Sequence, residues 1–364
     1  MKKYGCFILI FLLLLILPGV WMLVSPDRSF SDNENRMLAQ QPPLRAADLL
    51  SGDFQEGLEQ WLADQFPGRD GLMAADTVLK KALGYRDIGG AWLGRGGCAL
   101  EMHTPEDFDT AKFQRNLGYL ADLAREAELP ASALLVPCAA SVQPELLPAG
   151  AVSYDAGAAW EAARTAMPGV RVPDLTLALI KQREKQLFYR TDHHWTAEGV
   201  LAAYDCLTDG QGTYAGTPET FCSDFYGTTY SKTLDAALAP DQVKIFPVPD
   251  TVTASADGAQ IPLYDRSAAE RKDKYTVFLG GNHGLVTLTG GCRNGKTLLV
   301  LKDSFANSLA PLLTADYETV ILVDLRYYTG SVRTLLAQTP VDQLLFVYEM
   351  SNVASGDDFI KLLL

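Results

Sequence analysis

The stretch TLLVLKDSF, residues 297–305, joins a short apolar run to a polar turn that contains Ser304. Two runs of the same kind, TVILVDL and QLLFVYE, occupy Thr319–Leu325 and Gln343–Glu349, and segments of helical length separate the three runs. Strands that alternate with helices form a parallel sheet with helices on both faces. The C-terminal third therefore predicts an α/β fold built on a parallel sheet.

Earlier segments extend this prediction. SALLVP, residues 132–137, is an apolar run that ends at a proline, which is typical of a buried strand. Between about residues 209 and 295 the chain becomes rich in Gly, Thr and Asp, and short runs such as QVKIFPV and KYTVFLG predict strands. We interpret residues 106–364 as one α/β domain in which residues 209–295 form a partly β inserted subdomain.

The N-terminus, MKKYGCFILIFLLLLILPGVWML, has Lys2 and Lys3 followed by an apolar run over residues 6–24. About 20 apolar residues are enough to cross a bilayer. No small-residue cleavage pattern follows the run, which favours an uncleaved anchor over residues 1–25 rather than a signal peptide. Because the lysines should stay in the cytoplasm, we expect a single-pass protein of the cell membrane with its domain outside.

Residues 26–105 are expected to form a membrane-proximal segment. Its first part, SFSDNENRMLAQQPPL, is polar and then proline-rich, as in an extended linker. Its second part, DFQEGLEQWLADQFPGRD, places Phe54, Leu58, Trp61 and Leu62 at helical spacing before Pro67 and Gly68 end the element. This pattern predicts a docking helix.

Charge and cysteine content exclude some classes of function. The formal net charge of −13 argues against nucleic acid or an anionic membrane surface as partner, since both require a basic face. A neutral or carbohydrate-like substrate is compatible with it. Beyond Cys6 in the apolar run, five cysteines remain, and no C-x-x-C spacing indicates zinc or a redox pair.

Polar residues follow the predicted strands. Ligands of an open parallel sheet bind beyond the carboxyl ends of its strands, so these are the residues to inspect. They are Ser304 after the first run, Arg326 and Tyr327 after the second, Asn352 after the third, and Asp192 and His194 after LFY in the stretch LFYRTDHHWTAEG.

Three of these residues have the chemistry of a nucleophilic site. A serine hydroxyl needs a histidine to take its proton and a carboxylate to orient the imidazole. Ser304 lies at a strand-to-helix turn, and Asp192 lies two positions before His194, which is close enough to pair on a turn. We therefore predict Ser304 as nucleophile, His194 as base and Asp192 as the orienting carboxylate.

Several segments together resemble a known family. TDHHWT before a helix, KDSFANSLAPLL about 110 residues later, and then VDLRYY look like the DHHW family, relatives of the SGNH-hydrolase-like proteins that O-acetylate alginate. SFSDNENRML and DQFPGRD resemble the membrane-proximal segment of that group. The resemblance implies an SGNH-hydrolase-like domain whose motif order is permuted, because Asp192-x-His194 precedes Ser304.

The resemblance also implies a function. It predicts a serine-dependent acyltransferase that O-acetylates an exported or cell-surface polysaccharide, without a cofactor, and with a membrane-bound O-acyltransferase that supplies acetyl groups. Lys302 departs from the family, because the nucleophile block usually has Gly there. Asn352 takes the place of the Asn block, and Gly330 is a weak match to the Gly block. A carbohydrate esterase and a non-catalytic glycan-binding assembly subunit are the alternatives.

Structural roles were weighed for the same residues. Ser304 could cap the following helix, and Asp192 and His194 could form a turn network. His193 is expected to shape the turn, Trp195 could pack in the core or stack on a sugar, and GGNHG around Asn282 is expected to be a hairpin turn. Metal ligation by the Asp-His-His stretch, as in the DHH phosphoesterases, is disfavoured because no companion Asp cluster follows an early strand.

Overall fold

The structure is a computed structural model that describes residues 4–31, 33–34 and 36–363. Lys2 and Lys3, on which the predicted orientation depends, lie outside the described residues. The chain divides into two compact units. One comprises Met1–Tyr85 with Ser231–Ala236, and the other Arg86–Tyr230 with Ala237–Leu364.

The N-terminal unit consists mainly of helices. Helix α1 contains an 18-residue window, Gly5–Met22, with mean hydropathy 2.6, so by length and composition it is able to cross a membrane. The predicted docking helix forms as α3, where the buried Trp61 donates its Nε1–H to Asp27 (2.7 Å). The elements of this part of the chain are α1 (Gly5–Val24), β1 (Phe30–Ser31), β2 (Arg36–Met37), α2 (Ala46–Ser51), α3 (Asp53–Gln65) and α4 (Arg69–Ala82).

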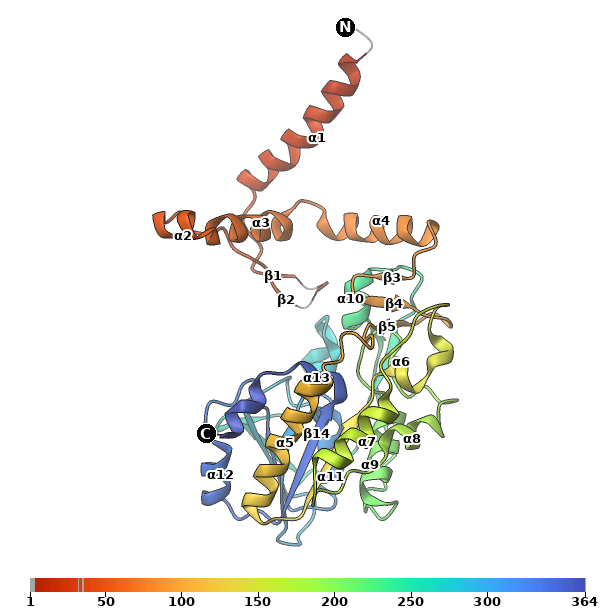
Figure 1. The fold of residues 1–364 in the computed structure, drawn as a ribbon, viewed down its shortest axis with the longest axis vertical. Coiled ribbons are helices and arrows are strands. Elements are labelled where there is room, and N and C mark those ends of the chain that lie inside the picture. The colour runs from red at the N-terminus through yellow and green to blue at the C-terminus, as the bar shows by residue number, and fades with distance from the viewer. Residues whose placement is uncertain (1–3, 32, 35, 364) are drawn as a thin grey trace. The chain divides into compact units, whose positions relative to one another are not determined.

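A seven-stranded sheet forms the centre of the second unit (Figure 1). Its strand order is β10-β9-β11-β13-β12-β14-β6. The neighbours β13, β12, β14 and β6 run parallel, whereas β9, β10 and β11 pair antiparallel. The strands are β6 (Ala131–Val136), β9 (Thr253–Ala256), β10 (Ala259–Ile261), β11 (Leu285–Thr289), β12 (Thr297–Lys302), β13 (Thr319–Val323) and β14 (Gln343–Glu349).

The sheet is therefore mixed, and the prediction of a parallel sheet was correct only for its four-stranded part. Strands β9 and β10 are joined by the two residues Asp257 and Gly258, and such a tight turn produces an antiparallel pair. Strand β11 lies between β9 and β13 and is antiparallel to both. Residues 253–289 of the predicted insertion thus extend the central sheet. The predicted boundaries at residues 25, 105, 209 and 295 remain predictions.

Both faces of the sheet are buried, and this explains why the central residues Leu298–Leu301 of β12 are all apolar. Leu298 and Val300 pack in one core with α8, α9 and α11, and Leu299 and Leu301 pack in the other with α5, α7 and α13. Helices on both faces require such continuous runs. The helices are α5 (Thr110–Ala127), α7 (Ala156–Ala166), α8 (Leu175–Ile180), α9 (Ala197–Thr208), α11 (Ala306–Leu313), α12 (Val332–Gln338) and α13 (Met350–Ser355).

Short elements complete the fold. QVKIFPV contains a strand as predicted, but Lys274–Val277 of KYTVFLG form the 3₁₀ helix η3. The consecutive residues Val277, Phe278 and Leu279 are all buried, without the alternation of a half-buried strand, and the chain then bends at two glycines. The remaining elements are β3 (Asp87–Ile88), β4 (Ala91–Leu93), β5 (Ala99–Glu101), α6 (Ala139–Val142), η1 (Pro144–Leu146), β7 (Glu219–Phe225), α10 (Thr228–Thr233), β8 (Asp241–Ile245), η2 (Arg266–Glu270), η3 (Lys274–Val277) and η4 (Asp358–Leu363).

Candidate active site

Three of the predicted site residues lie in one hydrogen-bonded series. His194 Nε2 is 2.8 Å from Ser304 Oγ, and His194 Nδ1 is 2.6 Å from Asp192 Oδ1. Ser304 directly follows β12 and is partly exposed, whereas Asp192 and His194 are buried. The imidazole therefore touches a hydroxyl on one side and a carboxylate on the other, which is the arrangement that general-base activation of a serine requires.

A tight turn explains the spacing of Asp192 and His194. Tyr189 donates its N–H to the carbonyl of His194 (3.1 Å), which closes the turn. Asp192 Oδ1 then accepts both the backbone N–H of His194 (2.9 Å) and the ring N–H at Nδ1. One carboxylate oxygen thus fixes both the backbone and the ring of the residue two positions later.

The second oxygen of Asp192 is also occupied. Oδ2 accepts the N–H (2.8 Å) and the hydroxyl (3.0 Å) of Thr228, whose hydroxyl also contacts His193 Nδ1 at 2.8 Å. Residue 227 is glycine because a Cβ there would lie 2.3 Å from Asp192 Cβ and Oδ2. His193 therefore shapes the turn as predicted, and it does so through Thr228.

The electrostatics of this pair favour a carboxylate beside a neutral imidazole. Burial alone would raise the pKa of Asp192, but the two neighbouring histidines and the Thr228 N–H outweigh burial and hold that pKa below its usual range. Burial and the charge of His193 lower the pKa of His194, against the opposing effect of Asp192. A neutral His194 has a free electron pair, which a base needs.

Aromatic packing fixes the plane of the imidazole. The ring of Tyr275 stacks on His194 with centroids 3.9 Å apart and an angle of 14° between planes. The Tyr275 hydroxyl is 2.9 Å from Ser308 Oγ, to which Trp195 donates its Nε1–H (2.8 Å). Trp195 is completely buried, so the structure places it in the core behind the site.

Asn352 lies next to the nucleophile's turn and bonds to Asp303. Asp303 Oδ2 accepts Asn352 Nδ2 (2.8 Å) and the N–H of Glu349 (2.8 Å), and its Oδ1 accepts the N–H of Phe305 (3.0 Å). Asp303 thereby joins the end of β14 to the turn that carries Ser304. The structure gives the Asn352 amide a bond that supports this turn.

Arg326 and Tyr327 lie after β13 as predicted. Arg326 forms a two-point ion pair with Asp324, with Nε–Oδ1 at 2.9 Å and Nη2–Oδ2 at 2.7 Å. Its guanidinium lies over the ring of Tyr327, which is 52% exposed. Arg326, Asn352 and Asp303 line a cavity of about 220 Å³ together with Tyr348 and Phe359.

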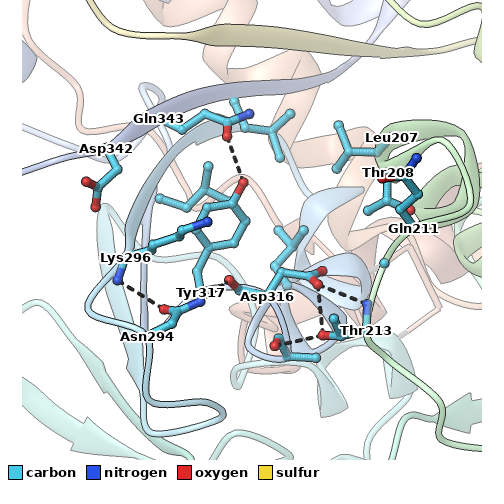
Figure 2. Close-up of a pocket in the computed structure, with 15 residues that line it drawn as sticks. Leu207, Thr208, Gln211, Thr213, Asn294, Lys296, Asp316, Tyr317, Asp342 and Gln343 are labelled. Carbon is cyan, nitrogen blue, oxygen red and sulfur yellow. Dashed lines mark hydrogen bonds between the residues drawn. The ribbon is translucent and has the colours of Figure 1, made fainter.

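The cavity of about 610 Å³ drawn in Figure 2 is larger, but it lies at the other end of β12. Its lining includes Lys296, Leu298 and Gln343, at the beginnings of β12 and β14, and Tyr317, whose hydroxyl donates to Gln343 Oε1 (2.8 Å). Ser304 follows the opposite, carboxyl end of β12. Cavity size therefore does not locate the hydroxyl, imidazole and carboxylate series.

Asp241 is a supporting residue that no sequence pattern indicated. It is buried on β8, and its carboxylate accepts the N–H groups of Arg190 (3.0 Å) and Thr191 (2.8 Å), the Thr191 hydroxyl (2.7 Å) and Gln186 Nε2 (2.9 Å). It holds the strand end that leads into the Asp192 turn. It lies about 50 residues away in sequence, where no local pattern connects the two.

Among the described residues, the side chains of the Asp-His-His stretch also lie close enough together to hold a metal ion. Asp192, His193 and His194 each offer a ligand atom within 4.8 Å of the others. In this structure Nδ1 and Nε2 of His194 contact Asp192 and Ser304, and both oxygens of Asp192 accept hydrogen bonds. The donor set is therefore arranged for proton transfer between side chains.

Family models match this part of the chain. The model of the DHHW protein family matches residues 175–323, which include Asp192, His194 and Ser304, and the model described as "SGNH hydrolase-like domain, acetyltransferase AlgX" matches residues 99–221. Both matches show what parts of this chain are similar to, namely DHHW proteins and SGNH hydrolase-like domains of the AlgX type. The resemblance to DHHW and AlgX-type proteins predicted from the sequence is confirmed.

Solved structures show the same fold. A DHHW family protein from Eubacterium siraeum is 20% identical, with a TM-score of 0.62 over 75% of this chain and 95% of its own. PatB1 from Bacillus cereus is 20% identical, with a TM-score of 0.61 over 72% and 97% of the two chains, and its form with a sulfonyl adduct gives 0.59 over 72% and 95% at the same identity. No curated protein matches the chain.

Asp241→Asn tests the supporting role of Asp241. An amide has one acceptor oxygen, so the NH₂ group of the new asparagine must face N–H or O–H donors that now bond to the second carboxylate oxygen. The variant should therefore lose ~1–3 kcal/mol of unfolding free energy, measured by urea denaturation. Asp250→Asn, at an exposed aspartate, is the matched control and should change stability by under ~0.5 kcal/mol. Equal stability of the two variants would contradict the role of Asp241.

Glu349 predicts a pH dependence of stability. Burial, opposed by the charge of His193 and supported by that of Glu101, raises the pKa of Glu349 to about 8. Between pH 4.5 and 8 the unfolded carboxyl loses its proton while the folded one keeps it, so this contribution to stability falls as pH rises through that window. Glu349→Gln should be more stable than the wild type at pH 8, on the order of 2 kcal/mol, and similar to it at pH 4.5.

Urea denaturation at both pH values measures this difference. Glu106→Gln, at an exposed position, is the control and should follow the wild type throughout. A Glu349→Gln variant whose stability relative to the wild type is the same at pH 4.5 and pH 8 would contradict the prediction.

Proposed function

We propose that the protein is an extracytoplasmic serine-dependent acyltransferase that O-acetylates an exported or cell-surface polysaccharide. The observation that carries this proposal is the hydrogen-bonded series from Ser304 Oγ through the His194 imidazole to Asp192. Ser304 and the Asp192–His194 turn, about 110 residues apart in the sequence, meet in the order that acyl transfer by a serine requires.

In the first half-reaction His194 Nε2 takes the proton of Ser304 as Oγ attacks the carbonyl carbon of an acyl donor. Asp192 stabilises the imidazolium that forms. The tetrahedral intermediate then collapses, the bond to the leaving group breaks, and the leaving group takes the proton from His194. The product is an acyl ester on Ser304.

In the second half-reaction a sugar hydroxyl attacks that ester. His194 takes the hydroxyl proton, the new ester forms on the sugar, and the proton returns to Ser304 Oγ as the acyl–serine bond breaks. Water in place of the sugar would give an esterase. The two activities differ only in the acceptor, so the assay must include both acceptors.

Acetyl transfer is supported by the family model of AlgX-type acetyltransferases, which matches residues 99–221. PatB1 has been solved with a sulfonyl adduct, which suggests a sulfonyl reagent as a covalent probe for this chain. In the proposed motif assignment the order is permuted relative to ordinary SGNH hydrolases, since Asp192 and His194 precede Ser304. No cofactor is part of the proposal.

The location and partners follow from α1 and from the source of acetyl groups. We take α1 as the single-pass anchor that keeps the domain outside the cytoplasm, with residues 6–24 in the membrane. Activated acetyl groups are made in the cytoplasm, so a membrane-bound O-acyltransferase is the proposed supplier. The polysaccharide is the proposed acceptor.

Ser304→Ala tests the nucleophile. Hydrolysis of an activated acetyl ester by the purified protein should be abolished, and thermal unfolding should be unchanged to within ~0.5 kcal/mol because one partly exposed hydroxyl is removed. His194→Ala should lose a comparable amount of activity. Asp192→Asn should lose ~10⁴-fold in kcat, since the amide favours the wrong imidazole tautomer.

His193→Ala is the neighbouring control and should be much milder, because His193 acts through Thr228. Labelling of the wild type by a sulfonyl fluoride, and its loss in Ser304→Ala, measures activation of the hydroxyl directly. If the wild type is not labelled and the Ser304→Ala variant still supports glycan acetylation in cells, the enzymatic proposal is wrong. The protein would then be a non-catalytic glycan-binding assembly subunit.

The lowered pKa of His194 predicts the acid limb of the pH–rate profile. His194 acts as a base only when neutral, so kcat/KM should fall as pH falls through its pKa, with a midpoint below the ordinary histidine value of about 6.5. Asp192 raises this pKa, so residual activity of Asp192→Asn should have a midpoint lower still. A wild-type midpoint above 7 would contradict the prediction.

A further inference from the structure

The turn from Leu279 to His283, which contains the first four residues of the GGNHG sequence, contacts Asn307 in the first turn of α11, the helix that follows Ser304. It joins η3 to β11 and is not the predicted hairpin turn. Three successive residues have positive φ angles: Leu279 at 62°, Gly280 at 74° and Gly281 at 116°. Leucine rarely adopts such a conformation, and the strain persists only where the surroundings hold it.

Asn307 in the first turn of α11 helps to hold the Leu279–His283 turn in this conformation. Asn307 donates its Nδ2 hydrogens to Asn282 Oδ1 (3.1 Å) and to the carbonyl of Gly281 (3.4 Å). Asn307 also donates its backbone N–H to the carbonyl of Ser304 (3.1 Å). Residues three apart on a helical turn share a face, so the Leu279–His283 turn lies on the side of Ser304.

Lys302 decides which way the Asn307 amide faces. Its Nζ is buried and lies 2.8 Å from Asn307 Oδ1 and 3.3 Å from Asp324 Oδ2. A lysine ammonium only donates hydrogen bonds, so the Asn307 oxygen must face Lys302 and its NH₂ must face the turn. The same reasoning places the Asn282 oxygen toward Asn307 and leaves its NH₂ as the outward end.

Two donors joined through Asn307 then have no acceptor in the part of the chain that the structure describes. These are Nδ2 of the exposed residue Asn282 and the backbone N–H of Ser304. Attack by Ser304 converts a carbonyl oxygen into an oxyanion, which N–H donors stabilise more in the transition state than in the substrate. The Asn352 amide, by contrast, is bonded to Asp303.

We propose that Asn282 donates to the oxyanion formed at Ser304, and that Lys302 and Asn307 are positioning residues that orient its amide. This inference rests on the proposed acyl transfer. It gives a role to Lys302, the residue by which the chain departs from the usual nucleophile block. It also explains how an exposed asparagine is held in one orientation beside the site.

The test measures kcat and KM of the purified full chain in detergent with an activated acetyl ester. Asn282→Ala should lower kcat ~10²-fold with little change in KM, because one transition-state donor is lost. Asn282→Asp should be lower still, because a carboxylate repels the oxyanion. Both should keep the wild-type midpoint of the acid limb, since His194 and its partners are unchanged.

Lys302→Met and Asn307→Ala test the positioning role. Each variant should lower kcat at least ~10-fold. Because Lys302 acts through Asn282, the kcat of the double variant Asn282→Ala, Lys302→Met should lie within ~2-fold of the kcat of Asn282→Ala alone. Lys296→Met and Asn294→Ala, exposed residues at the other end of β12, are the matched controls and should keep wild-type rates.

The outcomes separate this inference from the proposed function. Activity that persists in Ser304→Ala overturns the proposed acyl transfer. Loss of activity in Ser304→Ala with a rate for Asn282→Ala within threefold of the wild type overturns the role of Asn282 alone. Losses that multiply in the double variant overturn the positioning role of Lys302. If Lys302→Met fails to fold, the double variant Asn282→Ala, Asn307→Ala is compared with its two single variants instead, and it tests the positioning role in the same way.

Discussion

The Asp192 carboxylate is the constraint on which the candidate site depends. A buried carboxylate is stable only when hydrogen bonds replace the water it has lost. Asp192 obtains four, two from His194 and two from Thr228. Two of these bonds come from backbone N–H groups and one from the His194 ring, so the bonds that stabilise the charge also set the position of the imidazole.

The surrounding residues follow from that requirement. Gly227 leaves the space that Asp192 occupies, and Asp241 holds the preceding residues by their N–H groups. Tyr275 covers the imidazole face, which excludes water and keeps the ring in plane with its two partners. Several buried polar groups thus act as one network, in which each member is satisfied by the others.

The carboxyl ends of β12 and β13 concentrate charge. Asp303 and Asp324 lie at these ends, and Lys302 and Arg326 both form ion pairs with Asp324. A buried charge that loses its partner is costly, so these residues constrain one another's positions. On this view Lys302 is tolerated in the core because Asp324 and Asn307 both accept from it.

The sequence by itself determined the parallel part of the sheet, because a strand buried on both faces must be apolar on both, and the central residues 298–301 of β12, 320–323 of β13 and 344–347 of β14 are. It also indicated Ser304, His194 and Asp192 by their chemistry and their places after strands. It failed for KYTVFLG and for the direction of β11, since a short apolar run fits a strand or a buried 3₁₀ turn equally well, and pairing direction depends on distant partners. Thr228, Asp241, Tyr275 and Asn282 were decided only by the tertiary structure. Each acts through hydrogen bonds or a ring contact with residues distant in sequence, and such contacts have no periodic pattern to reveal them.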